Sequence, residues 1–197
     1  MLCGMSAVLK HPMSLEAFLD WESHQETRYE FDGFAPVAMT GGSVEQAIIQ
    51  RNLLGLLFGR LRGHRCQAFG SHLKVQVAGR IRYPDAFIVC SPIPPRAQVV
   101  HEPVVVFEIL SPSTDRTDRF VKNREYRDTP SIQRYAMLEQ SCPEATVFSR
   151  EGGDWVGHLV AGDADLVLPE IGISLPMGDL YEGVTFPDDS ETEPPLG

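Results

Sequence analysis

One strand-like segment limits what this chain can fold into more than any other part of the sequence. It is PVVVFEIL, residues 103–110, and every position except Glu108 is apolar. A short run that is apolar on both faces is typical of a central strand covered on each side. A carboxylate in such a strand is costly unless a cation or a metal ion compensates it. The segment therefore predicts a layered sheet with a charged site on its central strand.

Helical and strand-like patterns alternate on either side of this segment. Before the segment, we expect a helix at 14–23, a hairpin turning at Asp32-Gly33, a long helix capped by Ser43 and ending near residue 64, and strands within 66–70 and 72–90. After it, we expect a helix from the SPST sequence at 111–114 to about Asp128, a strand at 132–140 and a hairpin around Gly152-Gly153. This order favours a single α/β domain with a mixed sheet over residues 1–186.

The chain is acidic, with a formal net charge of -10 at pH 7 over 197 residues. Residues 187–197 contain four carboxylates and no lysine or arginine, which predicts a disordered tail. The remaining charge, -10 less these four, is -6 and still argues against binding nucleic acid through bulk electrostatics. An acidic protein can act on a polyanion if a divalent metal supplies local positive charge.

The cysteines indicate a reducing compartment. There are four, at Cys3, Cys66, Cys90 and Cys142, and they form no C-x-x-C pattern. We expect reduced thiols rather than structural zinc or a disulfide framework. The N-terminal sequence lacks the layout of a signal peptide, and no apolar run approaches the ~18–20 residues that span a bilayer. The expectation is a cytoplasmic protein.

A second carboxylate stands just before another strand-like run. Asp85 follows Pro84 and precedes the apolar residues 86–90. If that run pairs with the central strand, Asp85 and Glu108 converge as a two-carboxylate site for Mg²⁺ or Mn²⁺. The simpler alternatives are a turn residue after proline for Asp85 and a buried ion pair with lysine or arginine for Glu108.

The counter-charge for Glu108 has to come from elsewhere in the sequence. Side chains two positions apart share one face of a strand, and the residue two positions later is Leu110. On the following predicted helix, Lys122 and Tyr126 are four residues apart and share a face. A tight connection would pack that helix on the strand and bring Lys122 back toward Glu108. Without such packing, Lys122 is a solvated helix lysine.

Three segments together carry a resemblance to a known family. They are YPDAFIV at 83–89, VVVFEILSPST at 104–114 and DRFVKNREY at 118–126. The chain resembles the Uma family of restriction endonucleases, a branch of the PD-(D/E)XK nuclease superfamily, from about residue 14 to residue 184. The superfamily normally carries its lysine two residues after the acid. In this branch the lysine has moved to the following helix, which matches Leu110 and Lys122 here.

The resemblance implies a fold and a set of functional residues. The fold is a restriction-endonuclease-like mixed β-sheet core flanked by helices, with extra β-hairpins. The implied metal ligands are Asp85, Glu108 and the backbone carbonyl of Ile109. Lys122 would orient or stabilise the attacking water, and Tyr126 would support the site. The implied reaction is hydrolysis of DNA phosphodiester bonds with Mg²⁺ or Mn²⁺.

The resemblance also identifies a further candidate and three departures. Glu30 is the fourth catalytic candidate, as the acid from the N-terminal part of the fold; its alternative is a surface pair with Arg28. Gln46 stands where the family has histidine, His72 where relatives often carry a carboxylate, and Glu139 where aspartate is usual.

A second class of function fits the same fold. A nuclease-fold protein without useful catalysis could act as a binding or assembly module, and the acidic composition supports this alternative. A homodimer suits both functions, because duplex cleavage benefits from two sites. The geometry of Lys122 separates the two: a catalytic lysine points toward Asp85 and Glu108, whereas a solvent-facing lysine on the far side of its helix excludes that role.

Overall fold

The structure is a computed structural model that describes residues 12–39, 41–110 and 116–186, and only the backbone of residues 116–119. The expected tail at 187–197, the N-terminal sequence with Cys3 and the SPST connection lie outside the described residues. Within the described part, no helix is long and apolar enough to cross a bilayer.

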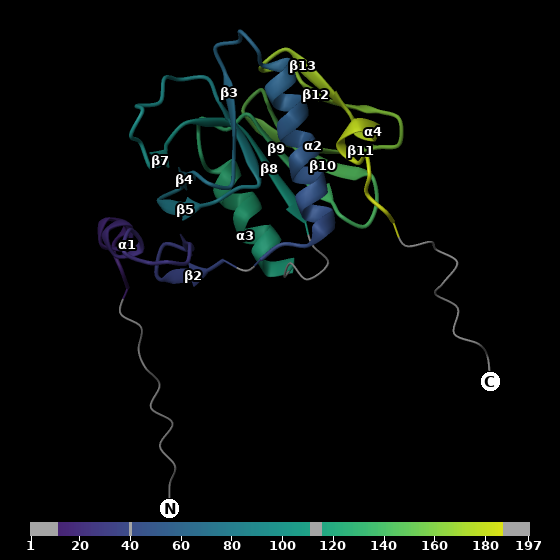
Figure 1. Cartoon of the computed structure of the whole chain (residues 1–197). Helices are drawn as coiled ribbons and strands as arrows, with labels where there is room; N and C mark the ends of the chain where they lie inside the picture. Colours follow the sequence, from purple (N-terminus) through teal and green to yellow (C-terminus); the bar gives the residue numbers. More distant parts are fainter. Residues whose placement is uncertain (1–11, 40, 111–115, 187–197) are drawn as a thin grey trace, which may run out of the picture.

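A six-stranded sheet forms the centre of the molecule, in the order β11-β10-β9-β8-β6-β3 (Figure 1). Its strands are β3 (Gln67–Gly70), β6 (Ala86–Val89), β8 (Pro103–Leu110), β9 (Arg134–Glu139), β10 (Glu144–Glu151) and β11 (Asp154–Ala161). The β8–β9 pair is parallel and the other neighbours are antiparallel. The sheet is therefore mixed, as the sequence predicted, and the apolar PVVVFEIL segment is one of its two central strands.

One helix covers each face of this sheet. Helix α2 (Val44–Arg60) packs on the face formed by the odd-numbered residues of β8. The contacting side chains are Ile49, Leu53 and Leu57 on the helix and Val105, Phe107 and Ile109 on the strand. Helix α3 (Arg116–Arg127) covers the opposite face, where Tyr126 packs with Val106 and Leu110. Glu108 lies between Val106 and Leu110 in the alternation of the strand, so its side chain is on the same face as theirs, toward α3.

The caps that fix these elements are readable in the sequence. The hydroxyl of Ser43 accepts the N–H of Gln46 at the start of α2, as expected for an N-cap. In the N-terminal hairpin, Asp32 Oδ1 accepts the N–H groups of Phe34 and Ala35, and Gly33 supplies the positive φ of the turn. Both elements begin where the sequence pattern predicted.

A second, five-stranded sheet has the order β2-β1-β5-β4-β7. Its strands are β1 (Tyr29–Phe31), β2 (Pro36–Ala38), β4 (Lys74–Val77), β5 (Arg80–Arg82) and β7 (Val99–Val100). Val75 and Val77 of β4 join the apolar cluster on the α3 face of the central sheet. Helix α1 (Leu15–Glu22) closes the outer side of the second sheet by burying Phe18. This sheet therefore lies on the same side of the molecule as α3.

The C-terminal part packs on the same face of the central sheet as α2. It consists of β12 (Asp165–Leu168), β13 (Ile173–Pro176) and the short helix α4 (Met177–Leu180). Leu166, Leu175 and Leu180 are fully buried in the cluster beneath α2. The sequence predicted short strands and turns here; the single-turn helix α4 is too brief to leave a periodic pattern.

Two cysteines contradict the expectation of reduced thiols. Cys66 and Cys90 form a disulfide across 24 positions of the sequence, whereas Cys142 is free. The register of β3 and β6 is the reason. Gln67 pairs with Val89, so the next residues outward, Cys66 and Cys90, lie opposite each other. Spacing along the chain does not reveal a cross-strand pair, and the prediction from spacing was wrong.

Candidate active site

Asp85 and Glu108 meet where β6 begins beside β8. The two strands are antiparallel with Ala86 opposite Phe107, so one further step along the same register sets Asp85 opposite Glu108. Residues directly opposed in such a ladder point to the same face, with Cβ atoms about 4.5–5.5 Å apart. Burial is the main cause that raises the pKa of Glu108, and the charge of the nearby Asp85 adds to the rise. The pairing that the sequence analysis required is present.

Two neutral donors hold the carboxylate of Asp85. Its Oδ2 accepts the backbone N–H of Ile109 at 2.7 Å, and its Oδ1 accepts from Nε2 of Gln46 at 2.9 Å. Burial raises the pKa of Asp85 above its ordinary value, while these two hydrogen bonds and the charge of Lys122 oppose the shift. Each carboxylate oxygen has a second lone pair that can bind a cation.

Glu108 lies beneath α3 and contacts two of its side chains. Its Oε1 accepts from the hydroxyl of Tyr126 at 2.5 Å and lies 3.9 Å from Nζ of Lys122. Burial, together with the charges of Asp85 and Glu30, raises the pKa of Glu108 to about 7 against the opposing effect of Lys122. Without a bound cation, this carboxyl group therefore holds a proton over much of the range below neutral pH.

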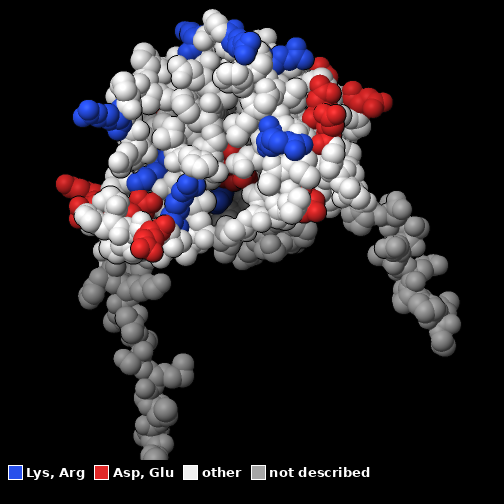
Figure 2. All heavy atoms as spheres, viewed as in Figure 1, with Lys and Arg blue, Asp and Glu red and all other residues white. Residues whose placement is uncertain are grey.

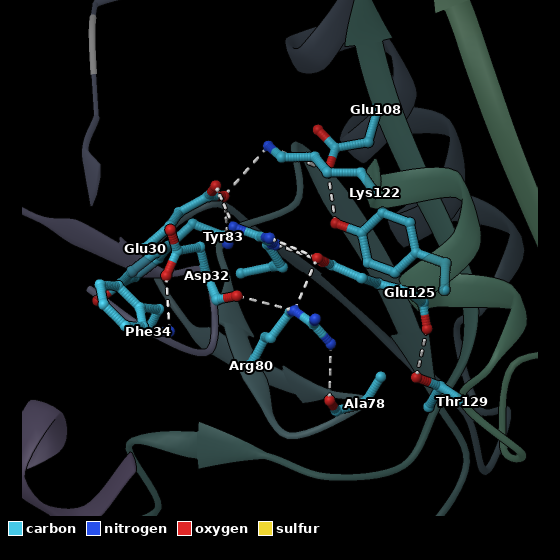
Figure 3. Close-up of polar contacts among 12 residues, drawn as sticks. Glu30, Asp32, Phe34, Ala78, Arg80, Tyr83, Glu108, Lys122, Glu125 and Thr129 are labelled. Atoms are coloured by element: carbon cyan, nitrogen blue, oxygen red, sulfur yellow. Dashed lines mark hydrogen bonds and ion pairs between the residues drawn. The ribbon is translucent and has the colours of Figure 1, made fainter. Parts of the chain in front are cut away.

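Lys122 points from α3 into the site rather than to solvent (Figure 3). Its side chain is 17% exposed, and Nζ lies 3.2 Å from Oε1 of Glu30. Tyr126 is one helical turn further on and reaches the same glutamate, Glu108, that Lys122 approaches. The helix that follows β8 thus returns a lysine to the acid on that strand. The side chains of Asp118 and Arg119, about one turn before Lys122, lie outside the described residues.

Glu30 is a buried member of this cluster. It extends from β1, and its carboxylate contacts Lys122, the backbone N–H of Tyr83 and the guanidinium of Arg82. Arg28 instead donates to the carbonyl of Ser71. The alternative of a surface pair between Glu30 and Arg28 is therefore wrong, because Glu30 is only 7% exposed and its carboxylate is held by these three other groups.

Sequence reasoning missed three residues that shape the site. Gln46 was noted as a departure from the family, and its amide binds Asp85. Arg82 and Glu125 form two parallel hydrogen bonds of 2.7 Å each, and both residues are 3% exposed. One signal for Glu125 was present in the sequence: it stands three residues after Lys122 on the same predicted helix. His72 is exposed, and Glu139 accepts the Tyr181 hydroxyl through its backbone carbonyl.

The donor set fits a hard divalent cation. Across the described residues, no group of three or more histidine, cysteine, aspartate or glutamate side chains is arranged to hold a metal. Asp85 and Glu108 therefore form a two-carboxylate set, and Mg²⁺ is commonly held by one or two carboxylates with water completing its shell. Oxygen donors without imidazole or thiolate also favour Mg²⁺ or Mn²⁺ over zinc. Ile109 contacts this set through its N–H.

Comparison with known proteins gives a consistent result. The model of the Uma2 family, described as "Putative restriction endonuclease", matches residues 15–178. An uncharacterized protein of Synechocystis sp. is 32% identical over 178 residues, which cover 88% of this chain and 94% of that protein. The site residues Glu30, Asp85, Glu108 and Lys122 all lie within the matched family range.

A solved structure shares the fold. It is the crystal structure of a protein from Anabaena variabilis described as a putative nuclease belonging to DUF820. The TM-score is 0.72 at 19% sequence identity, and the match covers 86% of this chain and 98% of that one. The mixed α/β architecture is therefore that of a nuclease-like fold, as the sequence predicted.

Proposed function

Because this chain belongs to the Uma2 family, described as "Putative restriction endonuclease", we propose that it is a divalent-metal-dependent endonuclease that hydrolyses DNA phosphodiester bonds. The observation that carries the proposal is the convergence of three groups of complementary chemistry. Asp85 and Glu108 offer carboxylate oxygens from neighbouring strands, and the ammonium of Lys122 lies beside them.

Each group has a distinct role in the proposed reaction. Asp85 and Glu108 would hold Mg²⁺ or Mn²⁺, with the carbonyl of Ile109 as a further ligand. The bound ion supplies Lewis-acid polarisation of the phosphate and lowers the pKa of water. Lys122 would orient the attacking water or offset the charge that develops on the phosphate oxygens, an effect worth roughly 3–4 kcal/mol per donor in well-studied sites. Glu30 contributes through its contact with Lys122.

The setting of the reaction completes the proposal. We propose a cytoplasmic protein with DNA as its substrate, acting as a homodimer so that the two strands of a duplex can be cut by two sites. The face in Figure 2 carries Lys and Arg along its upper edge, Asp and Glu at its lower left and upper right, and atoms of both charge signs in the hollow near its lower edge. An acidic protein opposes DNA approach, so a metal ion supplies the positive charge that the surface lacks.

A cleavage assay tests the proposal. Supercoiled and linear DNA are incubated with the wild-type protein in Mg²⁺ or Mn²⁺, beside Glu108→Ala and Lys122→Ala. We expect cleavage by the wild type, loss in Glu108→Ala and a reduction of roughly 10²–10³-fold in Lys122→Ala. Exposed Glu102 gives the matched control, Glu102→Ala, which should cleave normally.

The outcomes divide the two functions. Cleavage that both substitutions leave intact would contradict the proposed mechanism. A wild-type protein that binds DNA but never cleaves it, in either metal, would instead favour a nuclease-fold binding or assembly module. Sedimentation of the purified protein at micromolar concentration tests the homodimer separately.

A further inference from the structure

A buried chain of alternating charges connects the second sheet to α3 beside the site (Figure 3). Arg82, on β5, donates from Nε and Nη2 to the two carboxylate oxygens of Glu125, each at 2.7 Å. Its Nη1 donates to Oε2 of Glu30 at 3.1 Å. Lys122 then lies 3.2 Å from the other oxygen of Glu30. Strands β1 and β5 and helix α3 are thereby tied together through side chains.

The contacts of Glu30 indicate what this carboxylate does. Three donors surround it: Arg82 on one oxygen, and Lys122 and the N–H of Tyr83 on the other. Asp85 differs, because the two donors on its carboxylate, Gln46 and Ile109, are both neutral. A carboxylate whose charge is offset by two cations attracts a metal ion weakly. Glu30 is therefore suited to hold Lys122 and poorly suited to bind the metal.

Helix α3 is also held at Glu125, the last member of this series of charged side chains. Glu125 is three residues after Lys122, and its carboxylate forms an ion pair with Arg80 at 3.0 Å as well as accepting from Arg82. The hydroxyl of Thr129 donates to the backbone carbonyl of Glu125 at 2.9 Å. Arg82 thus contacts both a residue of the helix, Glu125, and the acid that Lys122 contacts, Glu30.

We propose that Arg82 and Glu125 are positioning residues for Lys122 and that Glu30 is its anchor rather than a metal ligand. The proposal rests on the proposed function only where catalysis is concerned. Stability alone accounts poorly for such a pair, since replacing a buried ion pair by apolar residues of similar size is often neutral or stabilising. A forked guanidinium between two acids does define one geometry, which a single lysine–carboxylate contact does not.

The lysine content of the chain allows a direct test that does not need activity. There are only three lysines, Lys10, Lys74 and Lys122. Reductive dimethylation in chelator, followed by peptide mass spectrometry, gives the labelling rate of each. Lys10 is the internal reference for reagent reactivity, and circular dichroism verifies that every variant is folded.

Two site variants and one matched control carry the test. The first is Glu30→Gln. The second is Arg82→Met with Glu125→Gln, which removes the fork without leaving an isolated buried charge. The control, Arg134→Met with Glu170→Gln, removes a similarly buried arginine–glutamate pair of 2.9 Å elsewhere in the fold. We expect Lys122 to label about fivefold faster or more in both site variants and at the wild-type rate in the control. Arg82→Lys, which keeps one ion pair, should give an intermediate rate.

Two further measurements separate the inference from the proposed function. Mn²⁺ affinity, followed by electron paramagnetic resonance, should change less than about twofold in Glu30→Gln and be lost in Glu108→Gln. Under the proposed function, the fork variant should lower kcat by about tenfold or more with KM nearly constant. Unchanged labelling of Lys122 overturns the positioning role, and loss of Mn²⁺ binding in Glu30→Gln overturns the anchor role. A wild type without cleavage refutes the proposed function while the labelling result still decides this inference.

Discussion

At the scale of single residues, the site combines groups that are unfavourable for folding. Asp85 and Glu108 are each 8% exposed, lie opposite each other and carry raised pKa values because of burial. The protein tolerates this arrangement through specific donors: an amide and an N–H for Asp85, and a phenol for Glu108. Such a cluster costs stability, and a cost of this kind is expected if the cluster has the catalytic role proposed above.

Glu108→Gln should therefore stabilise the protein in chelator. The folded-state pKa of Glu108 is about 7 against an ordinary value of 4.5, so the folded protein binds more protons between these values. Wild-type stability should fall as pH rises from about 4.5 to about 7, and the variant lacks this loss. The variant should gain roughly 1–3 kcal/mol at pH 8 and almost nothing at pH 4. Urea unfolding with Glu102→Gln as the control measures this, and equal gains at both pH values would contradict it.

Gly42→Ala should weaken metal binding without touching an acid. A Cβ on Gly42 would lie 2.3 Å from Oε1 of Gln46, so the amide that donates to Asp85 must move. Loss of a hydrogen bond to a metal-binding carboxylate typically lowers the metal affinity by about 10–100-fold. Gly41→Ala is the matched control, because nothing lies within 4 Å of its added Cβ. Titration with Mn²⁺ should separate the two variants, and equal affinities would show that Gln46 is dispensable.

At the scale of elements, the site exists because three units meet around one strand. Strand β8 supplies Glu108, the residue before β6 is Asp85, and helix α3, which follows β8 in the chain, places Lys122 beside Glu108. The second sheet adds Glu30 from β1. The β3–β6 disulfide closes the far end of the strand that Asp85 precedes, so it stabilises the edge of the sheet without contacting the site.

The disulfide gives a prediction at this scale. Non-reduced protein should show an intact mass about 2 Da below that of the reduced chain, and Cys66→Ala with Cys90→Ala should lower the free energy of unfolding by about 3 kcal/mol. The entropy of closing a loop of this length in the unfolded chain is the reason. Cys142→Ala is the control, since Cys142 is free. Equal stability of the double variant and the wild type under non-reducing conditions would contradict the prediction.

At the scale of the whole molecule, acidity is the property that most affects binding of the proposed DNA substrate. The net charge of -10 repels a polyanion, and four of these charges lie in residues 187–197. Removing residues 187–197 should therefore speed association with DNA at low ionic strength, and the gain should vanish above about 0.5 M salt. Fluorescence anisotropy in Ca²⁺ measures the rates. A gain that persists at high salt would indicate an effect other than charge.

The sequence alone was sufficient to predict the long helices, the strands of the central sheet and the acids of the site, but not the short elements α4 and β7. Local patterns are sufficient for this: the apolar run of β8, the Ser43 cap of α2 and the Asp32-Gly33 turn act over a few neighbouring residues. Lys122 was also predicted from the sequence, because helical spacing and the family resemblance both indicated it.

The contacts between side chains that are distant in the sequence depend on the tertiary structure alone. Cys66 and Cys90 are paired by a strand register, Gln46 reaches Asp85 across 39 positions, and Arg82 joins Glu30 to Glu125. In the sequence each of these reads as an ordinary thiol, amide or surface charge. Burial and register give them their roles, and both arise from packing between elements far apart in the chain, which no local pattern encodes.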